Sequence, residues 1–253
     1  MGRVASIVAT TLLWSFGSPA LAAEIKLMSP GAVMSSLKEL IPAFEQASGH
    51  RVLVTYAPAL SIAVRLKNNE ACDVAITGKG AAGALEKSGR LAVGSTTVIA
   101  RVGVGVFVRR GDPKPDVSTA DAFKRALLDA KVIVYSDPTL GGSASNYVHG
   151  LLADLDTTGE IKPKIRLASQ YRSIANTVAA GGVDLALNQI AEIVADPRLE
   201  LVGPLPEPYQ YYTDYVAGIV ATSASQSAGK EFIDFIATTG AAAILRRRGF
   251  EPN

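Results

Sequence analysis

Small residues gather at three junctions where a predicted strand gives way to a predicted helix. They are Ser29-Pro30-Gly31-Ala32, Ala57-Pro58-Ala59-Leu60-Ser61 and Gly141-Gly142-Ser143-Ala144-Ser145. The first turn of a helix carries unpaired N–H groups and the positive end of the helix dipole, so it attracts an anion. Small side chains let a ligand approach the backbone closely. One such junction is typical of any α/β protein, whereas three in one chain predict an anion-binding cleft. We expect this cleft to be lined by Ser29, Gly31, Ala32, Ala59, Ser61, Ser143 and Ser145.

Basic side chains near these junctions are candidates for holding carboxylates. Arg65 lies one turn inside the second predicted helix, Lys79 directly follows a strand, and Arg172 immediately precedes another helix. An arginine can bind a carboxylate with two parallel hydrogen bonds. A residue of this kind is more often a solvated surface charge than a ligand contact, and that is the alternative explanation for each of the three. We place Arg172 and Lys79 at the rim of the cleft.

Proton transfer in the cleft would need a titratable group, and the catalytic candidates are His149 and Lys79. His149 lies one turn beyond Ser145, and an imidazole changes charge near neutral pH; its alternative explanation is a half-buried helix residue. Asn188, just past a predicted strand, adds amide donors and acceptors to the expected binding residues. Tyrosines at 209, 211, 212 and 215 supply hydroxyls and flat walls, or else pack between domains.

Composition excludes several functional classes. The chain has 25 Lys and Arg against 23 Asp and Glu, and the basic residues are scattered, which argues against a nucleic-acid partner. Cys72 is the one cysteine, and the two histidines, His50 and His149, belong to no cluster with metal-ligand spacing. The sequence has no P-loop and no dinucleotide fingerprint. We therefore expect no metal and no cofactor.

The first 23 residues predict a cleavable export signal. Arg3 precedes an apolar stretch from Val4 to Phe16, and Ala20 and Ala22 give the spacing that signal peptidase recognises. The mature chain is expected to begin at Ala23 or Glu24. Because the apolar stretch is too short to span a bilayer, we expect a periplasmic protein without stable membrane insertion after cleavage.

The rest of the sequence alternates short apolar runs with amphipathic helical patterns, which predicts an α/β fold. Strands are expected at 25–28, 51–56, 73–77, 102–109, 131–135, 165–167, 184–187, 199–202 and 215–221. Helices are expected at 33–47, 61–68, 81–88, 121–130, 146–155, 173–180, 227–236 and 240–248. If the strands at 102–109 and 215–221 both cross between domains, the chain forms two lobes with a cleft at the sheet edges. The expected division is signal 1–23, lobe one 24–104 plus 217–253, and lobe two 105–216.

Several segments resemble the periplasmic molybdate-binding proteins of ABC transporters. The resemblance rests on 24–48, on 52–77, on the loop Ser136-Asp137-Pro138, and on the ending from Phe232 to Phe250. It covers essentially the whole mature chain. It implies a two-lobed periplasmic solute-binding fold, each lobe a mainly parallel sheet flanked by helices, with the ligand cleft between the lobes. It also implies an ABC permease as the partner that receives the ligand.

The ligand positions of that family are changed in this sequence. Molybdate binders hold the oxyanion with one serine hydroxyl from each of the first two strand–helix loops and with a later tyrosine. Here the resemblance puts those positions on Gly31 or Ala32, on Ala59 or Leu60, and on Asn188. It therefore implies that the scaffold is kept and the molybdate ligands are replaced, and a missing hydroxyl costs about 1–3 kcal/mol.

One branch of the family is similar to aconitate isomerase, which interconverts trans- and cis-aconitate. That resemblance implies Arg65, Lys79 and Arg172 as carboxylate clamps, with His149 or Lys79 as the proton carrier. We expect capture of a small anion, a carboxylate ahead of molybdate, for ABC-type uptake. The alternative is a cofactor-free isomerase, and a third hypothesis is molybdate or tungstate capture by rearranged hydroxyls such as Ser29 and Ser61.

Overall fold

The computed structural model describes residues 22–169 and 171–251; most of the predicted export signal lies outside them. The strands are β1 (Glu24–Ser29), β2 (Arg51–Tyr56), β3 (Val74–Gly78), β4 (Thr97–Arg109), β5 (Ile133–Ser136), β6 (Ile165–Ala168), β7 (Leu185–Gln189), β8 (Leu199–Pro204) and β9 (Tyr212–Ile219). The helices are α1 (Met34–Ser48), α2 (Ala59–Lys67), α3 (Lys79–Lys87), α4 (Ala120–Asp129), α5 (Ser143–Leu155), α6 (Tyr171–Ala180), α7 (Ile190–Ile193), α8 (Gln226–Ile236) and α9 (Thr239–Arg247). Short 3-10 turns are η1 (Gly31–Val33), η2 (Pro138–Leu140) and η3 (Lys162–Lys164).

Within the described residues, the strands form one nine-stranded mixed sheet in the order β2-β1-β3-β9-β4-β7-β5-β6, with β8 paired to β4. β1, β2 and β3 run parallel, as do β5, β6 and β7. β9 is antiparallel to β3 and to β4. The parallel groups at the two ends therefore flank a central antiparallel ribbon.

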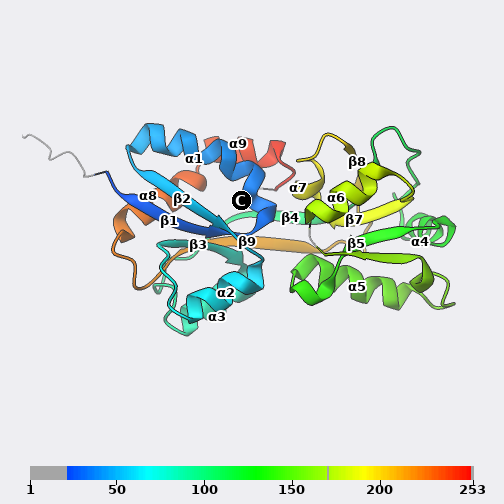
Figure 1. Cartoon of the computed structure of the whole chain (residues 1–253), viewed down its shortest axis with the longest axis horizontal. Coiled ribbons are helices and arrows are strands. Elements are labelled where there is room, and N and C mark those ends of the chain that lie inside the picture. Colours follow the sequence, from blue (N-terminus) through cyan, green and yellow to red (C-terminus); the bar gives the residue numbers. More distant parts are fainter. Residues whose placement is uncertain (1–21, 170, 252–253) are drawn as a thin grey trace, which may run out of the picture.

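β4 belongs to both halves of this sheet. Its residues Thr97–Gly103 pair with β9, and from Val104 onward the strand pairs with β7 and β8 instead. We call the part built on β2, β1, β3, β9 and the first half of β4 the first lobe. The part built on the second half of β4 with β5 to β8 is the second lobe. Figure 1 shows β4 and β9 running side by side between them.

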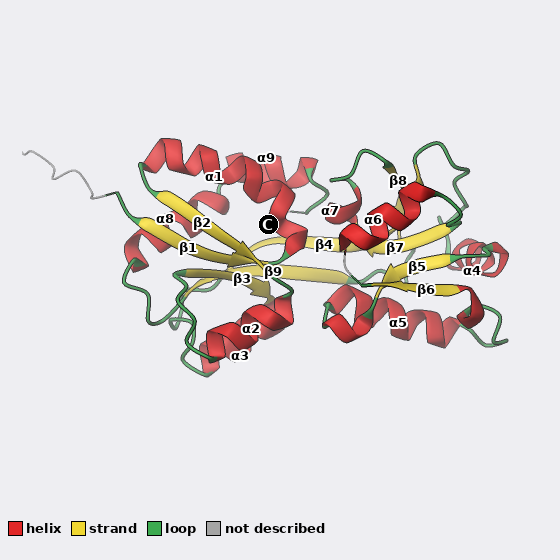
Figure 2. Ribbon diagram, in the orientation of Figure 1, coloured by secondary structure: helices red, strands yellow, loops and turns green. Residues whose placement is uncertain are grey.

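Helices cover both faces of each lobe (Figure 2). In the first lobe α1, α8 and α9 pack on one face around Leu37, Phe44 and Phe232, and α2 and α3 pack on the other around Ile62 and Leu85. In the second lobe α5 lies below the strands and α6 and α7 lie above them. Periodic apolar positions therefore decide which side of each helix meets the sheet.

The predicted α/β, two-lobed fold is confirmed, with small shifts at the ends of its elements. β4 begins at Thr97, five residues before the predicted start at 102. α5 begins at Ser143 and α2 at Ala59, each before its predicted start. The residue boundaries of the two lobes stay a prediction. The shifts of α2 and α5 matter because they move small residues from loops into the first turns of helices.

Candidate functional site

A cavity of about 860 Å³ lies between the two lobes, at the carboxyl ends of the parallel strands. Residues just past β1, β2 and β3 line it from the first lobe, and residues at the ends of β5, β6 and β7 line it from the second. Open α/β sheets bind ligands at this edge. The lining residues are Pro30–Ala32, Tyr56–Leu60, Ala63, Gly78–Ala81, Ser136, Asp137, Leu140–Ser145, Ser169, Asn188, Gln189, Glu192 and Tyr211–Tyr215.

Several helices open onto this cavity with uncapped first turns. η1, which leads into α1, begins at Gly31, and α2, α3 and α5 begin at Ala59, Lys79 and Ser143. Among the described residues, none of their N-cap positions makes a side-chain cap hydrogen bond. α4 and α9, which begin elsewhere, are capped by threonine hydroxyls, although α8 is uncapped too. The cavity therefore presents converging N–H groups that suit a negatively charged ligand.

A chain of hydrogen bonds ties one wall of the cavity to both lobes. The Tyr215 hydroxyl donates to the Gln189 side-chain oxygen at 2.8 Å, and the Gln189 amide nitrogen donates to the Thr213 hydroxyl at 3.0 Å. The hydroxyl oxygens of Thr213 and Ser143 lie 3.1 Å apart. Because these residues come from β9, β7 and α5, the chain fixes the relative position of elements from the two lobes.

The charged groups at the rim are partly neutralised by their neighbours. Lys79 is exposed, and its Nζ lies 4.0 Å from Asp214 Oδ2. Asp214 also accepts from Arg101 Nε at 3.0 Å. Asp137 accepts from the backbone N–H and hydroxyl of Thr139, which lower the pKa of its carboxyl. Lys79 is the one basic residue among the described residues that line the cavity.

Glu192 brings a titratable carboxyl into the cavity. It lies in α7, four residues beyond Asn188 of β7, whose side-chain amide donates a hydrogen bond to it. Burial raises the pKa of the Glu192 carboxyl to about 7, and the hydrogen bond from Asn188 opposes that rise. The Glu192 charge also contributes to a raised pKa of Tyr215, after the larger effect of burial. The wall that α7 forms therefore holds a carboxyl whose pKa lies near neutrality.

Glu192→Gln is expected to stabilise the protein at high pH more than at low pH. Because the pKa of this carboxyl is about 7 in the fold against an ordinary 4.5, the folded state holds its proton more tightly than the unfolded state. Stability of the parent protein therefore falls as pH rises through this window. The glutamine cannot ionise, so the variant escapes that loss. Thermal melts should show the variant's Tm above the parent's at pH 8 and level with it or lower at pH 4.5; an equal difference at both pH values would contradict the assignment.

The structure brings most of the predicted binding residues together. Gly31, Ala32 and Ala59 line the cavity from the first lobe, as does Lys79. Ser143, Ser145 and Asn188 line it from the second lobe. The Ser145 hydroxyl donates to the Gly142 carbonyl at 2.9 Å, so it braces the first turn of α5.

Four of the other predicted residues lie elsewhere. Ser29 is fully buried and donates to the Pro30 carbonyl at 3.2 Å, and Ser61, inside α2, is absent from the lining. His149 is exposed on α5, with Nδ1 2.8 Å from the Tyr135 hydroxyl, and it does not line the cavity. Arg65 Nε donates to Glu70 at 2.7 Å within its own lobe. Arg172 belongs to the first turn of α6, and its side chain lies outside the described part of the chain.

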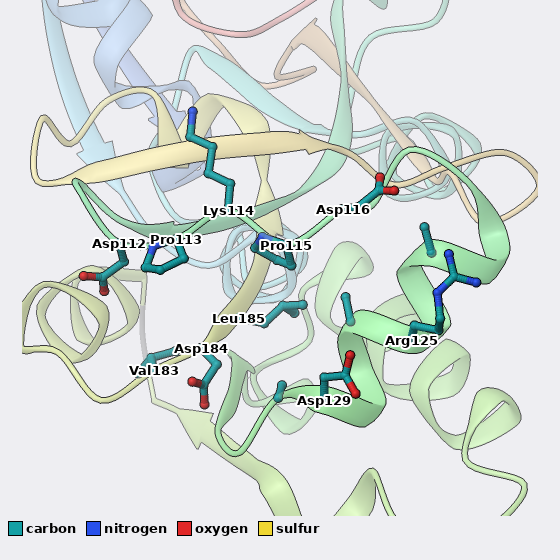
Figure 3. Close-up of a pocket in the computed structure, with 13 residues that line it drawn as sticks. Asp112, Pro113, Lys114, Pro115, Asp116, Arg125, Asp129, Val183, Asp184 and Leu185 are labelled. Atoms are coloured by element: carbon teal, nitrogen blue, oxygen red, sulfur yellow. The ribbon is translucent and has the colours of Figure 1, made fainter.

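A second cavity, of about 420 Å³, lies between the loop at Pro113–Pro115 and α4 (Figure 3). Its lining includes four carboxylates, among them Asp112 and Asp184, against the cations Lys114 and Arg125. Asp184 accepts from the backbone N–H groups of residues 131 and 132. Asp112 is paired with Arg109. These carboxylates hold loops in place and would repel an anion, so we place the candidate site in the cavity between the lobes.

Two further results bear on the kind of site. Within residues 22–169 and 171–251, no group of three or more His, Cys, Asp or Glu side chains is arranged to hold a metal ion. In the same part of the chain, no helix combines the length and apolar character that crossing a bilayer requires.

Comparison with known proteins places the chain in a family. The family model of bacterial extracellular solute-binding proteins matches residues 25–251. Aconitate isomerase of a Pseudomonas species is 30% identical over 244 residues, which are 93% of this chain and 92% of that protein. The periplasmic molybdate-binding protein of Azotobacter vinelandii has the same fold (TM-score 0.71, 20% identity, 89% of this chain and 98% of that one). So does PEB3 of Campylobacter jejuni with L-phospholactate bound (TM-score 0.70, 15% identity, 90% and 100%). The chain therefore belongs to the bacterial extracellular solute-binding proteins.

Proposed function

We propose that this protein captures a small organic anion, a carboxylate, in the cavity between its lobes. The observation that carries the proposal is the convergence of the uncapped first turns of η1, α2, α3 and α5 on one cavity. Backbone N–H groups at helix N-termini hold negative charge without a large basic patch. This agrees with the formal net charge of +2 for the whole chain.

An organic anion fits this cavity better than a tetrahedral metal oxyanion. Its volume of about 860 Å³ falls in the range of roughly 300–1,000 Å³ of sites that hold organic molecules. Ser29, offered as a replacement hydroxyl for molybdate, is buried against the Pro30 carbonyl, and Ser61 does not line the cavity. PEB3, which has the same fold, holds the small organic anion L-phospholactate. These findings support a carboxylate ahead of molybdate.

We place this activity in the periplasm, after removal of a signal over residues 1–23. Lobe boundaries near residues 104 and 216 would let the lobes close on the ligand by bending the β4–β9 ribbon. An ABC permease would then receive the ligand from the closed form.

Thermal-shift measurements on the mature protein test the proposed ligand class. A ligand present at 100 times its Kd stabilises the fold by about 2.7 kcal/mol, which raises the Tm of a protein of this size by roughly 5–11 °C. We expect such a shift with trans-aconitate, cis-aconitate or another small polycarboxylate. A shift with molybdate or tungstate that the carboxylates fail to produce would contradict the proposal.

Lys79→Ala is expected to weaken carboxylate binding about two- to fivefold. The ammonium is exposed and shared with Asp214, so its contribution to holding an anion is that of a partly solvated charge. Lys87→Ala, at the opposite end of α3 and exposed, removes the same charge away from the cavity and serves as the control. Titration calorimetry should show weaker binding only for the Lys79 variant, and equal affinities for the two variants would exclude this role.

The second candidate function is isomerisation of aconitate, favoured by the 30% identity to the Pseudomonas aconitate isomerase. Such a reaction breaks a C–H bond at one end of a three-carbon unit, moves the double bond, and forms a C–H bond at the other end. The cavity offers N–H groups for the charge that develops between these steps. Proton NMR of trans-aconitate with the protein in deuterated buffer tests it. Formation of cis-aconitate with deuterium incorporation is expected, and unchanged, undeuterated substrate would leave the protein a binder alone.

A further inference from the structure

Glu192 is an acid–base group in the wall of the cavity between the lobes. It follows the carboxyl end of β7, where the helix α7 turns its carboxyl toward Asn188 and the cavity. α7 contacts η1, the turn through which the first lobe reaches the cavity. A ligand held by the helix first turns of both lobes would therefore contact Glu192 on the second-lobe side of the cavity.

Among the described residues, other titratable groups also line the cavity, and several of them have hydrogen-bond or ion-pair partners of their own. They are Tyr56, Lys79, Asp137, Tyr211, Tyr212, Asp214 and Tyr215. The Asp137 carboxylate caps η2 by accepting the backbone N–H of Thr139, and the Asp214 carboxylate accepts a hydrogen bond from Arg101. The Tyr215 hydroxyl donates a hydrogen bond to Gln189, and burial raises the pKa of this hydroxyl further from neutrality.

We propose that Glu192 is the catalytic base and acid of an allylic proton shift in an unsaturated polycarboxylate. This inference rests on the isomerase function proposed above. The Glu192 carboxylate takes a proton from a saturated carbon next to the double bond, and the electron pair of that C–H bond becomes the new double bond. The Glu192 carboxyl exchanges the proton with solvent, and the former double-bond pair then takes a proton from Glu192 at the other end of the three-carbon unit. Atoms and charge balance without a cofactor.

The surroundings of Glu192 suit this exchange. A carboxyl whose pKa is about 7 removes a proton from carbon more readily than one with an ordinary pKa, and still returns it near neutral pH. The Asn188 amide, which donates to the carboxyl, fixes its orientation. The first turns of α2, α3 and α5 line the same cavity, and their N–H groups would stabilise the negative charge that the carbon skeleton carries between the two transfers.

The test compares the parent protein with Glu192→Gln, Glu192→Asp and the control Glu160→Gln, which removes an exposed carboxylate in the loop before η3. Trans-aconitate is the probe. NMR follows cis-aconitate formation and deuterium incorporation, and calorimetry measures the Kd.

We expect Glu192→Gln to lower both rates at least 100-fold with the Kd within threefold, and Glu192→Asp to restore part of the loss. The rate of the parent should rise with pH through about 7, and this limb should be absent in Glu192→Gln.

Two results would overturn the proposal, and they differ. If the parent isomerises the substrate and Glu192→Gln keeps more than a tenth of its rate, Glu192 is not the proton carrier although the proposed isomerase stands. If the parent binds trans-aconitate but neither isomerises it nor exchanges its protons, the isomerase function fails and the role of Glu192 fails with it.

Discussion

Gly31→Phe is expected to weaken ligand binding at least 100-fold while leaving the unliganded fold intact. Gly31 begins η1 and lines the cavity, and no heavy atom lies within 4 Å of a Cβ added there. The aromatic ring would therefore extend into the space that the ligand occupies rather than into the core. A 100-fold loss corresponds to about 2.7 kcal/mol of binding free energy.

Calorimetry with the best carboxylate from the thermal-shift series measures this effect. Gly150→Phe is the matched control, because Gly150 is exposed on α5 and a Cβ there also meets nothing within 4 Å. The control should bind like the parent. Parent-like affinity in Gly31→Phe would mean that the ligand binds away from η1, and the proposed cavity would have to be abandoned.

Phe232→Ala is expected to lower the free energy of unfolding by about 3–5 kcal/mol. Phe232 is 0% exposed in α8, and its ring meets that of Phe44 edge to face at 5.1 Å between centroids. Removing the ring leaves a cavity between α8 and α1 that neither helix can fill. For a protein of this size the Tm should fall by roughly 6–20 °C.

Urea denaturation and thermal melts of the same samples measure this loss. Val93→Ala is the control, since Val93 is 89% exposed and its truncation leaves no cavity. Because Phe232 does not line the cavity between the lobes, ligand affinity at low temperature should be unchanged. A loss below about 1 kcal/mol would mean that α1 and α8 pack together without this ring.

The order of strands and helices follows from the sequence because each element carries its own apolar period. Leu37, Leu40 and Phe44 face the sheet at helical spacing, and Gly49 ends the helix in the left-handed conformation that favours glycine. The early start of β4 was harder to predict. Residues 97–101 pair with β9, which lies more than a hundred positions later in the chain, so local pattern carries little of that information.

The part of the candidate cavity that depends on the backbone can be predicted from the sequence, and the part that depends on packed side chains cannot. The sequence predicts that Gly31, Ala59 and Ser143 lie in first turns of helices that could bind an anion. The structure places all three at one cavity. Glu192 is not singled out by the sequence, because Asn188 lies in β7 and Glu192 in the short helix α7, so no one periodic pattern joins them. Its burial and its raised pKa come from tertiary packing, which no local pattern reports.

For charged residues, too, the sequence does not reveal the contacts that the side chain makes in the fold. Arg65 and His149 were candidates because of their chemistry, yet each meets a nearby partner instead. Glu70, five residues away, takes the Arg65 guanidinium, and the Tyr135 hydroxyl meets His149. Sequence alone does not say which of several nearby partners a long side chain selects.

The position of β9 has a consequence for how the protein is made. β9 lies between β3 and β4 in the sheet, but its residues Tyr212–Ile219 come after every strand of the second lobe. Because the chain is synthesised from its N-terminus, β4 to β8 are complete while β3 still lacks its neighbour β9. An unpaired strand edge is a template for wrong pairing. We expect the newly synthesised chain to depend on protection of β3 until its last fifth arrives, and late truncations to cause aggregation rather than release of a folded half.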